Sequence, residues 1–427
     1  MTSTQDLLAR RNRVFGRGAP LFYSEPLQIV RGEGAFLFDA QGRRYVDLYN
    51  NVPCVGHANP RVAEAVARAQ RTLNVHSRYL HEDIVRLAER YTALHGGAIE
   101  NVVFSCSGTE ANEIAIQIAR IATGKRGIIC CAGAYHGNST LVSQLTEVDP
   151  DRPRTGEVRS FPLPDPYRLP AAAGAASAAE YYLRRAEAAI QALEQDAGGL
   201  AAMLVCPILA NEGTPNMPVG FLAQLAERVR RAGGLVIADE VQAGYGRTGR
   251  WWGYSVAGIR PDVVVTGKPM GNGVPLAATA SSADLMQAFR DRSRYFNTCA
   301  SSPLQAAAGL AVLEEIESRG LVEHVGKLGA FLSSELRARE GRRPWLGEVR
   351  GPGLFINIEI VKDRSSRAPD PALAARIVDE LVKEGFLTGT NGALGNQVKI
   401  RPPLVLEEPE ARAFLDAFDR VMDRIPG

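Results

Sequence analysis

A lysine and a carboxylate each follow a short apolar run, and both could take part in chemistry. Lys268 comes after the run 262–266 and before the glycine-punctuated stretch 269–273, and Asp239 ends the run 235–239. An amine at the end of a rigid element in a cleft has a lowered pKa and can act as a nucleophile and a base. A carboxylate there can pair with a protonated ring nitrogen. Alone, the two residues would also fit a solvated strand-end lysine and a helix-capping or loop carboxylate.

A second set of residues could bind a phosphate and a flat ring. Ser107-Gly108-Thr109 joins an apolar run to a predicted helix, so free backbone amides and the helix dipole would face an anion. Tyr135-His136-Gly137 follows the next run, and an aromatic there could stack on a ring, although such a tyrosine is more often a core residue. An amine, a carboxylate, an anion site and an aromatic contact are what pyridoxal 5′-phosphate (PLP) needs from a protein. We therefore predict PLP as the cofactor.

Short apolar runs alternate with helical patterns between about residues 100 and 282, which predicts an α/β fold with a mainly parallel sheet and crossover helices. Open sheets of this kind bind ligands at the carboxyl ends of their strands, where Lys268 and Asp239 would then lie. The stretch 149–179 is rich in Pro, Ala and Gly and is predicted to be a surface excursion. The predicted strands are Asn101–Cys106, Gly127–Cys131, Ala201–Cys206, Leu235–Ala238, Asp262–Thr266 and Leu276–Ala280, with strand-like segments at Arg350–Val361 and Gln397–Leu406.

The length of 427 residues suggests more than one structural unit. We predict a large PLP-binding domain over 59–303, a smaller α+β C-terminal domain over 304–427, and an N-terminal segment, 1–58, that packs with the small domain. The chain has 49 basic and 47 acidic residues and no run of five like charges, which argues against nucleic acid as a partner. No apolar stretch is long enough to span a membrane and no secretory signal is visible, so we expect a cytoplasmic protein. The six cysteines and six histidines lack ligand spacing, so no metal is predicted.

Four motifs resemble one known family, the class III (ornithine/GABA-type) PLP-dependent aminotransferases, from about Glu25 to Leu406. The resemblance implies PLP-dependent transferase fold type I, a Schiff base between Lys268 and PLP, and an obligate homodimer with shared active sites. The motifs are Ser107-Gly108-Thr109-Glu110-Ala111-Asn112-Glu113, Tyr135-His136-Gly137, Asp239-Glu240-Val241-Gln242 with Gly246-Arg247-Thr248-Gly249, and Gly267-Lys268 followed by Gly271-Asn272-Gly273.

The resemblance also implies a role for individual residues around the cofactor. Gly108 and Thr109 would hold the phosphate, and Tyr135 would stack on the ring. Asp239 would pair with the ring nitrogen and, with Lys268, would be catalytic. Thr298 would reach the phosphate of the neighbouring subunit's cofactor. The predicted cofactor-binding residues are Gly108, Thr109, Tyr135, His136, Asp239, Val241 (packed on the other ring face), Gln242 (at the phenolic oxygen), Lys268 and Thr298.

Within the family, the segments 50–57 and 77–81 look most like the alanine–glyoxylate aminotransferase-2-like branch, which also contains phospho-lyases. The predicted reaction is transfer of an amino group from an amine or amino acid to a keto acid or aldehyde. The alternatives are a PLP-dependent lyase that eliminates phosphate from a phosphorylated amine, and a catalytically silent PLP-fold binding protein. The candidate substrate contacts are Asn51, Val52, Arg78 and Arg401.

Two positions depart from the family pattern. Lys399 stands where many members place a substrate-carboxylate arginine, whereas Arg401 directly precedes Pro402-Pro403. Residues two apart on a strand share a face, so Lys399 and Arg401 would line one anion pocket or form a surface-facing basic pair. Cys206 stands where many members carry a glutamate that shields the arginine, and Glu212 comes six residues later. The dual-substrate switch of ornithine- and GABA-type members is therefore in doubt for this chain.

Overall fold

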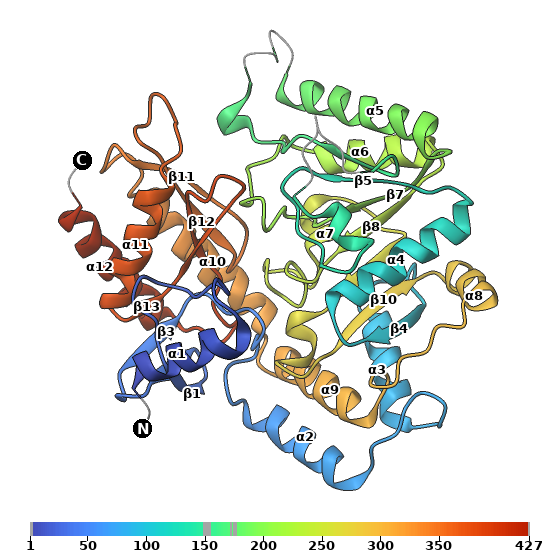
Figure 1. Cartoon of the computed structure of the whole chain (residues 1–427), viewed down its shortest axis with the longest axis horizontal. Coiled ribbons are helices and arrows are strands. Elements are labelled where there is room, and N and C mark those ends of the chain that lie inside the picture. Colours follow the sequence, from blue (N-terminus) through green and yellow to red (C-terminus); the bar gives the residue numbers. More distant parts are fainter. Residues whose placement is uncertain (1–2, 148–154, 171–172, 174–176, 426–427) are drawn as a thin grey trace.

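The computed structural model describes residues 3–147, 155–170, 173 and 177–425, and a seven-stranded sheet lies at its centre (Figure 1). The strand order is β4-β10-β9-β8-β7-β5-β6. Every strand runs in the same direction except β10, which is antiparallel to both of its neighbours. The strands are β4 (Asn101–Ser105), β5 (Gly127–Cys131), β6 (Val158–Phe161), β7 (Leu200–Val205), β8 (Leu235–Asp239), β9 (Val263–Thr266) and β10 (Ala277–Ser281). The six strands predicted for this region are present, each with ends within one residue of the prediction.

Both faces of the sheet are covered by helices, which explains why most of its strands are mainly apolar. In β5, Ile128 and Cys130 pack with α4 (Gly108–Thr123) and α8 (Ala283–Arg292) on one face. Ile129 and Cys131 pack on the other face with α5 (Ala178–Asp196) and α6 (Phe221–Arg231). Side chains alternate between the two faces of a strand, so a strand buried on both sides carries no polar alternation.

Strand β6 departs from the prediction for the stretch 149–179. It pairs with β5 in parallel register at the edge of the sheet, and Val158, Ser160 and Phe161 are buried. The prediction of a surface excursion is therefore wrong for 158–161. Four residues that include an arginine and a serine are too short and too polar to form a recognisable apolar run. Residues 149–154, 171–172 and 174–176 of the stretch lie outside the described residues.

Two smaller sheets lie beside the central one (Figure 1). One has the order β11-β12-β15-β14, formed by β11 (Leu346–Arg350), β12 (Ile356–Ile360), β15 (Gln397–Ile400) and β14 (Gly389–Asn391). The other joins β1 (Ile29–Glu33), β2 (Phe36–Asp39) and β3 (Arg44–Asp47) to β13 (Phe386–Leu387). The parallel β3–β13 pairing ties the N-terminal segment to the C-terminal part of the chain. The helices of this half are α10 (Leu321–Arg337), α11 (Pro371–Lys383) and α12 (Glu408–Arg424).

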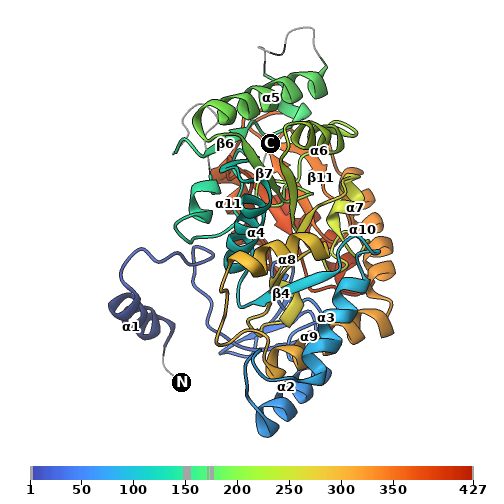
Figure 2. The same cartoon turned by 90° about the vertical axis from the view of Figure 1, so that its right-hand side faces the viewer.

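The remaining helices link or flank these layers. The pair α2 (Pro60–Thr72) and α3 (Glu82–Ala93) packs on α9 (Pro303–Ser318). Helix α1 (Thr4–Phe15) buries none of its residues and stands apart from the rest of the chain (Figure 2). Short helices occur at α7 (Gly253–Ala257), η1 (Val142–Leu145), η2 (Pro166–Arg168) and η4 (Lys268–Gly271). None of the helices in the described ranges has the length and apolar character needed to cross a bilayer.

Candidate active site

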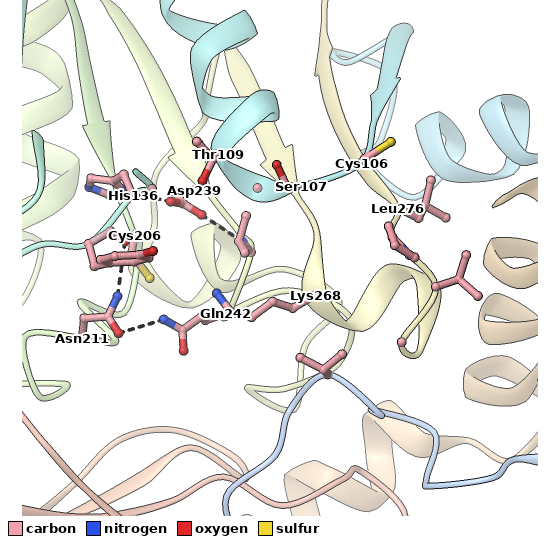
Figure 3. A pocket seen from close by; sticks show the side chains of 18 residues that line it. Cys106, Ser107, Thr109, His136, Cys206, Asn211, Asp239, Gln242, Lys268 and Leu276 are labelled. Carbon is pink, nitrogen blue, oxygen red and sulfur yellow. Dashed lines mark hydrogen bonds and ion pairs between the residues drawn. The ribbon is translucent and has the colours of Figure 1, made fainter. Parts of the chain in front are cut away.

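A cavity of about 330 Å³ lies where the carboxyl ends of β4, β5, β7, β8 and β9 meet (Figure 3). This is the edge of an open α/β sheet at which ligands bind. Val52 closes the cavity from the N-terminal segment, and residues 273–276 close it from the connection to β10. Eight of the nine predicted cofactor-binding residues line it: Gly108, Thr109, Tyr135, His136, Asp239, Val241, Gln242 and Lys268.

Lys268 follows β9 and begins the short helix η4. Its φ angle is +25°, a conformation that residues other than glycine rarely adopt. Burial and the nearby Arg401 lower the pKa of its amine, although the charge of Asp239 opposes them. The fold thus holds an amine inside the cavity in a strained backbone and favours its neutral form.

Asp239 ends β8, and three groups donate hydrogen bonds to its carboxylate. His136 Nδ1 lies 2.7 Å and Asn112 Nδ2 lies 3.0 Å from Oδ2, and the backbone N–H of Val241 donates to Oδ1 at 3.0 Å. Burial alone would raise the pKa of this carboxyl, but the hydrogen bond and charge of His136, helped by the other two donors, bring it below its usual value. The cavity therefore contains a buried carboxylate that stays ionised.

The first turn of α4 forms one wall of the cavity. Ser107 caps the helix, with its Oγ accepting from the backbone N–H of Glu110 at 3.2 Å. A Cβ atom on Gly108 would lie 2.9 Å from Cγ2 of Val241, so only glycine fits there without a shift. Across the same turn, Gly137 has a φ of +145°, and a Cβ atom on it would lie 2.5 Å from Oγ1 of Thr109. These close approaches leave the free amides of a helix N-terminus open to an anion.

Two buried cations lie beside the cavity. Arg401 donates through Nη1 to Oε1 of Gln242 and through Nε to the carbonyl of Tyr49 at 3.2 Å, and Gln242 in turn donates to Oδ1 of Asn211 at 3.0 Å. Burial lowers the pKa of Arg401 to about 10 and lowers the pKa of Lys399 well below its usual value. Only 4% of Lys399 and 6% of Arg401 is exposed, so the surface-facing alternative for this pair is wrong.

The other predicted residues are divided between the cavity and the surface. Val52 lines the cavity, whereas Asn51 is buried nearby with an Nδ2 that has no partner among the described residues. Arg78 and Thr298 are exposed and do not line the cavity of their own chain. Arg78 Cζ lies 4.1 Å from the ring centroid of Phe296, two residues before Thr298, so both belong to one surface.

Some residues at the site were not anticipated from the sequence. Asn112 bridges the Asp239 carboxylate and the carbonyl of His136, at 3.0 and 2.8 Å. Asn112 is a polar residue among the buried, mostly apolar side chains of α4, next to Ala111, and such a residue needs a hydrogen-bond partner. Cys206 lines the cavity at the departure from the family pattern, and Glu212 is buried close by. Within the described ranges, no group of three His, Cys, Asp or Glu side chains is arranged to hold a metal ion.

The cavity fits PLP on the chemistry of its donors. The ionised carboxylate of Asp239 suits a protonated ring nitrogen, and the amine of Lys268 has a pKa lowered toward the neutral form. A glycine-lined helix N-terminus at Gly108 suits a phosphate. Tyr135 and Val241 also line the cavity and offer an aromatic and an apolar surface to a flat ring. Each group that the cofactor presents therefore has a matching residue on the cavity wall.

Comparisons with known proteins agree with this fit. The profile of the class-III aminotransferases matches residues 22–422. An alanine–glyoxylate aminotransferase 2-like protein of Drosophila melanogaster is 34% identical over 97% of this chain and 86% of its own length. A phospholyase from Arthrobacter in complex with phosphoethanolamine superposes with a TM-score of 0.93 at 39% identity, over 99% of this chain and all of that chain. The omega transaminase of Pseudomonas jessenii in complex with PMP gives 0.86 at 28% identity, over 97% and 94% of the two chains. The chain therefore belongs to the class III aminotransferase family, and its cofactor is pyridoxal 5′-phosphate.

Proposed function

We propose that this enzyme transfers an amino group from an amine or amino acid to a keto acid or aldehyde, with Lys268 and Asp239 as its catalytic residues. The observation that carries the proposal is that an amine with a lowered pKa and a buried, ionised carboxylate line one cavity. Bound PLP supplies an electron sink for the negative charge that develops at the substrate carbon.

The residues of the chain divide the remaining work. Asp239 holds a proton at the ring nitrogen, and His136, Asn112 and the backbone N–H of Val241 keep its carboxylate ionised and oriented. Lys268, with its lowered pKa, is neutral in a larger fraction of molecules than an exposed lysine and can carry a proton from one carbon to another. The first turn of α4 holds the phosphate, which fixes the ring between these two groups.

A panel of amino donors tests the transfer reaction. Each donor is mixed with the holoenzyme, and the visible absorbance of the lysine-bound cofactor is followed until a keto acid restores it. The wild type should lose and regain this absorbance, whereas Lys268→Ala should show neither change. Lys327→Ala is a matched control, because Lys327 is exposed and pairs with the equally exposed Glu323. Normal turnover by Lys268→Ala would refute the proposal.

A second candidate, a lyase that eliminates phosphate from a phosphorylated amine, is favoured by the charge around the cavity. Lys399 and Arg401 are buried there, and Cys206 stands at the position where the shielding carboxylate was expected. Two basic side chains that have no direct carboxylate partner among the described residues suit a phosphate group as well as a carboxylate. The Arthrobacter relative was solved with phosphoethanolamine. Release of ammonia and phosphate from phosphoethanolamine, without any keto acid, would establish this second reaction; amino transfer without phosphate release would exclude it.

We also propose a homodimer with shared active sites. Arg78 and Thr298 lie together on the surface, away from the cavity of their own chain, where they would serve the cavity of a second copy. Tyr79 and Leu80 are 61% and 102% exposed in the same segment. Apolar side chains this exposed suit a protein interface. Mixed dimers of Lys268→Ala and Thr298→Ala subunits should regain activity that neither parent shows, and a monomer by light scattering would refute the proposal.

We also propose a cytoplasmic location and domain boundaries near residues 59 and 303. All six cysteines are free thiols, which suits a reducing compartment such as the cytoplasm. Recovery of the protein in the membrane or secreted fraction would contradict this location. The separate central and C-terminal sheets support boundaries near 59 and 303. Limited proteolysis should cut first near these positions, and first cuts inside the sheets would contradict the division.

A further inference from the structure

Glu212 is a buried carboxyl group whose two oxygens have no hydrogen-bond partner in the described part of the chain. Its loop is held in place from the C-terminal sheet. Asn391 Nδ2 donates to the carbonyl of Ala210 at 2.9 Å, and Asn357 Nδ2 donates to Oγ1 of Thr214 at 2.7 Å. The side chain therefore cannot turn out into solvent without breaking these contacts. An unpaired buried carboxylate is costly, so the group needs either a proton or a partner.

A second unpartnered group lies on the neighbouring segment. Nδ1 of His136 is 2.7 Å from the Asp239 carboxylate, whereas its Nε2 is buried and has no partner among the described residues. Glu212 lies against the segment that leads to His136, because a Cβ atom on Gly133 would be 3.9 Å from Cγ of Glu212. After burial, the charge of His136 is the largest influence on the carboxyl of Glu212. The two groups without a hydrogen-bond partner, the Glu212 carboxyl and Nε2 of His136, thus belong to one buried region next to Asp239.

We propose that Glu212 is a positioning residue that shares one proton with Nε2 of His136 and thereby holds His136 on the carboxylate of Asp239. The ionised carboxylate of Asp239 can only accept a hydrogen bond, so Nδ1 of His136 must carry the hydrogen that it donates. Nε2 is then the ring nitrogen at which a second proton can bind. One proton held between Nε2 and the Glu212 carboxyl through a bridging water would satisfy both groups. No bond other than these hydrogen bonds forms. The inference rests on the proposed role of Asp239 at the cofactor.

The shared proton makes the arrangement sensitive to pH. Burial raises the pKa of Glu212 to about 7, so the proton is kept below neutral pH and lost above it. Without it, a carboxylate faces the lone pair of Nε2, and His136 is held less firmly on Asp239. The titratable groups around Glu212 are Cys130 and Cys131 on β5, His136 after it, Cys206 after β7, Asp239 on β8 and Lys399 on β15.

Release of the cofactor from the holoenzyme tests the inference without measuring turnover. The wild type should release PLP, followed by the loss of its visible absorbance, about tenfold faster at about pH 8.5 than at about pH 6, as expected for one hydrogen bond to a charged group. Glu212→Gln should release it at a rate that varies less than about twofold over this range. In a His136→Asn background, Glu212→Gln should have no further effect, because the residue acts through His136. The matched control is Glu315→Gln, whose carboxylate is bonded to Asn59 and Arg61 and does not line the cavity.

The outcomes separate this inference from the proposed function. A wild-type holoenzyme without the visible absorbance of a lysine-bound cofactor would overturn both. Normal absorbance, with the same pH dependence of release in the wild type and in Glu212→Gln, would overturn only the role of Glu212. If Glu212→Gln does not fold, the wild-type profile decides, since a release rate that does not change between these two pH values contradicts a shared proton.

Discussion

Replacing Gly137 by alanine should weaken cofactor binding by displacing the first turn of α4. The added Cβ would lie 2.9 Å from Cα and Cβ of Thr109, whereas ordinary contact begins at 3.4 Å. The difference requires the helix N-terminus to retreat by about 0.5 Å, because a backbone atom cannot rotate away. A misplacement of about 1 Å costs on the order of 10²-fold in a positioned site, so half of it corresponds to about tenfold in affinity. The φ of +145° adds about 1–3 kcal/mol of strain in the folded protein.

Titration of the apo protein with PLP, followed by the absorbance of the lysine-bound cofactor, gives the dissociation constant. Gly124→Ala is the matched control, because Gly124 also has a positive φ, +68°, but nothing lies within 4 Å of its added Cβ. Both variants should unfold at a lower temperature than the wild type, and only Gly137→Ala should bind PLP less tightly. A dissociation constant for Gly137→Ala within about twofold of the control would refute the reasoning that the contact with Thr109 positions the phosphate site.

Three further changes test other residues of the cavity. Burial lowers the pKa of Lys268 in the folded protein below the usual lysine value of 10.5. The unfolded chain therefore binds a proton at this amine more readily than the folded protein does. As the pH falls from 10.5 through the pKa of the folded state, the wild type loses stability. Apo Lys268→Met should therefore resist urea better than the apo wild type at neutral pH, and an advantage that does not shrink in alkali would contradict this. Asp239→Asn should lower kcat by about 10²-fold and weaken PLP binding, and unchanged kinetics would show that the charge is not used. Arg401→Ala should raise KM for donors with an anionic group by about 10- to 100-fold while leaving neutral amines within about twofold; equal effects on both donors would remove Arg401 from substrate binding.

The central strands could be predicted because burial on both faces leaves a plain apolar run in the sequence. β7, for example, is six buried residues from Leu200 to Val205. β6 could not be found in this way, because Arg159 and Ser160 interrupt a strand of four residues. The sequence between β9 and β10 also explains why β10 runs in the opposite direction. The connection 267–276 contains no room for a crossover helix, so the strand that follows it must run antiparallel.

Eight of the nine predicted cofactor-binding residues line one cavity because they occur in short motifs directly after strands, where the fold brings separate loops together. The residues that contact these site residues could not be predicted from the sequence, since their positions depend on which side of a helix or loop faces the cavity. Asn112 reaches Asp239 from the second turn of α4, and Glu212 meets the His136 segment from a loop 76 positions away. The Lys399–Arg401 pair shows the same limit. The spacing predicted a common face, but only the packing of β15 showed that this face is buried.

The position of β4 at the edge of the central sheet has a consequence for biosynthesis. β4 leads into the turn at Ser107-Gly108 that we propose binds the phosphate, and its hydrogen-bonding neighbour is β10, with Ser105 opposite Ala277 and Asn101 opposite Ser281. A ribosome delivers residues 101–105 long before residues 277–281, so the nascent chain must carry β4 as an unpaired strand for most of the synthesis of the sheet. PLP cannot be captured during that time, and a chain terminated before residue 277 would leave this apolar edge open to other chains and to aggregation.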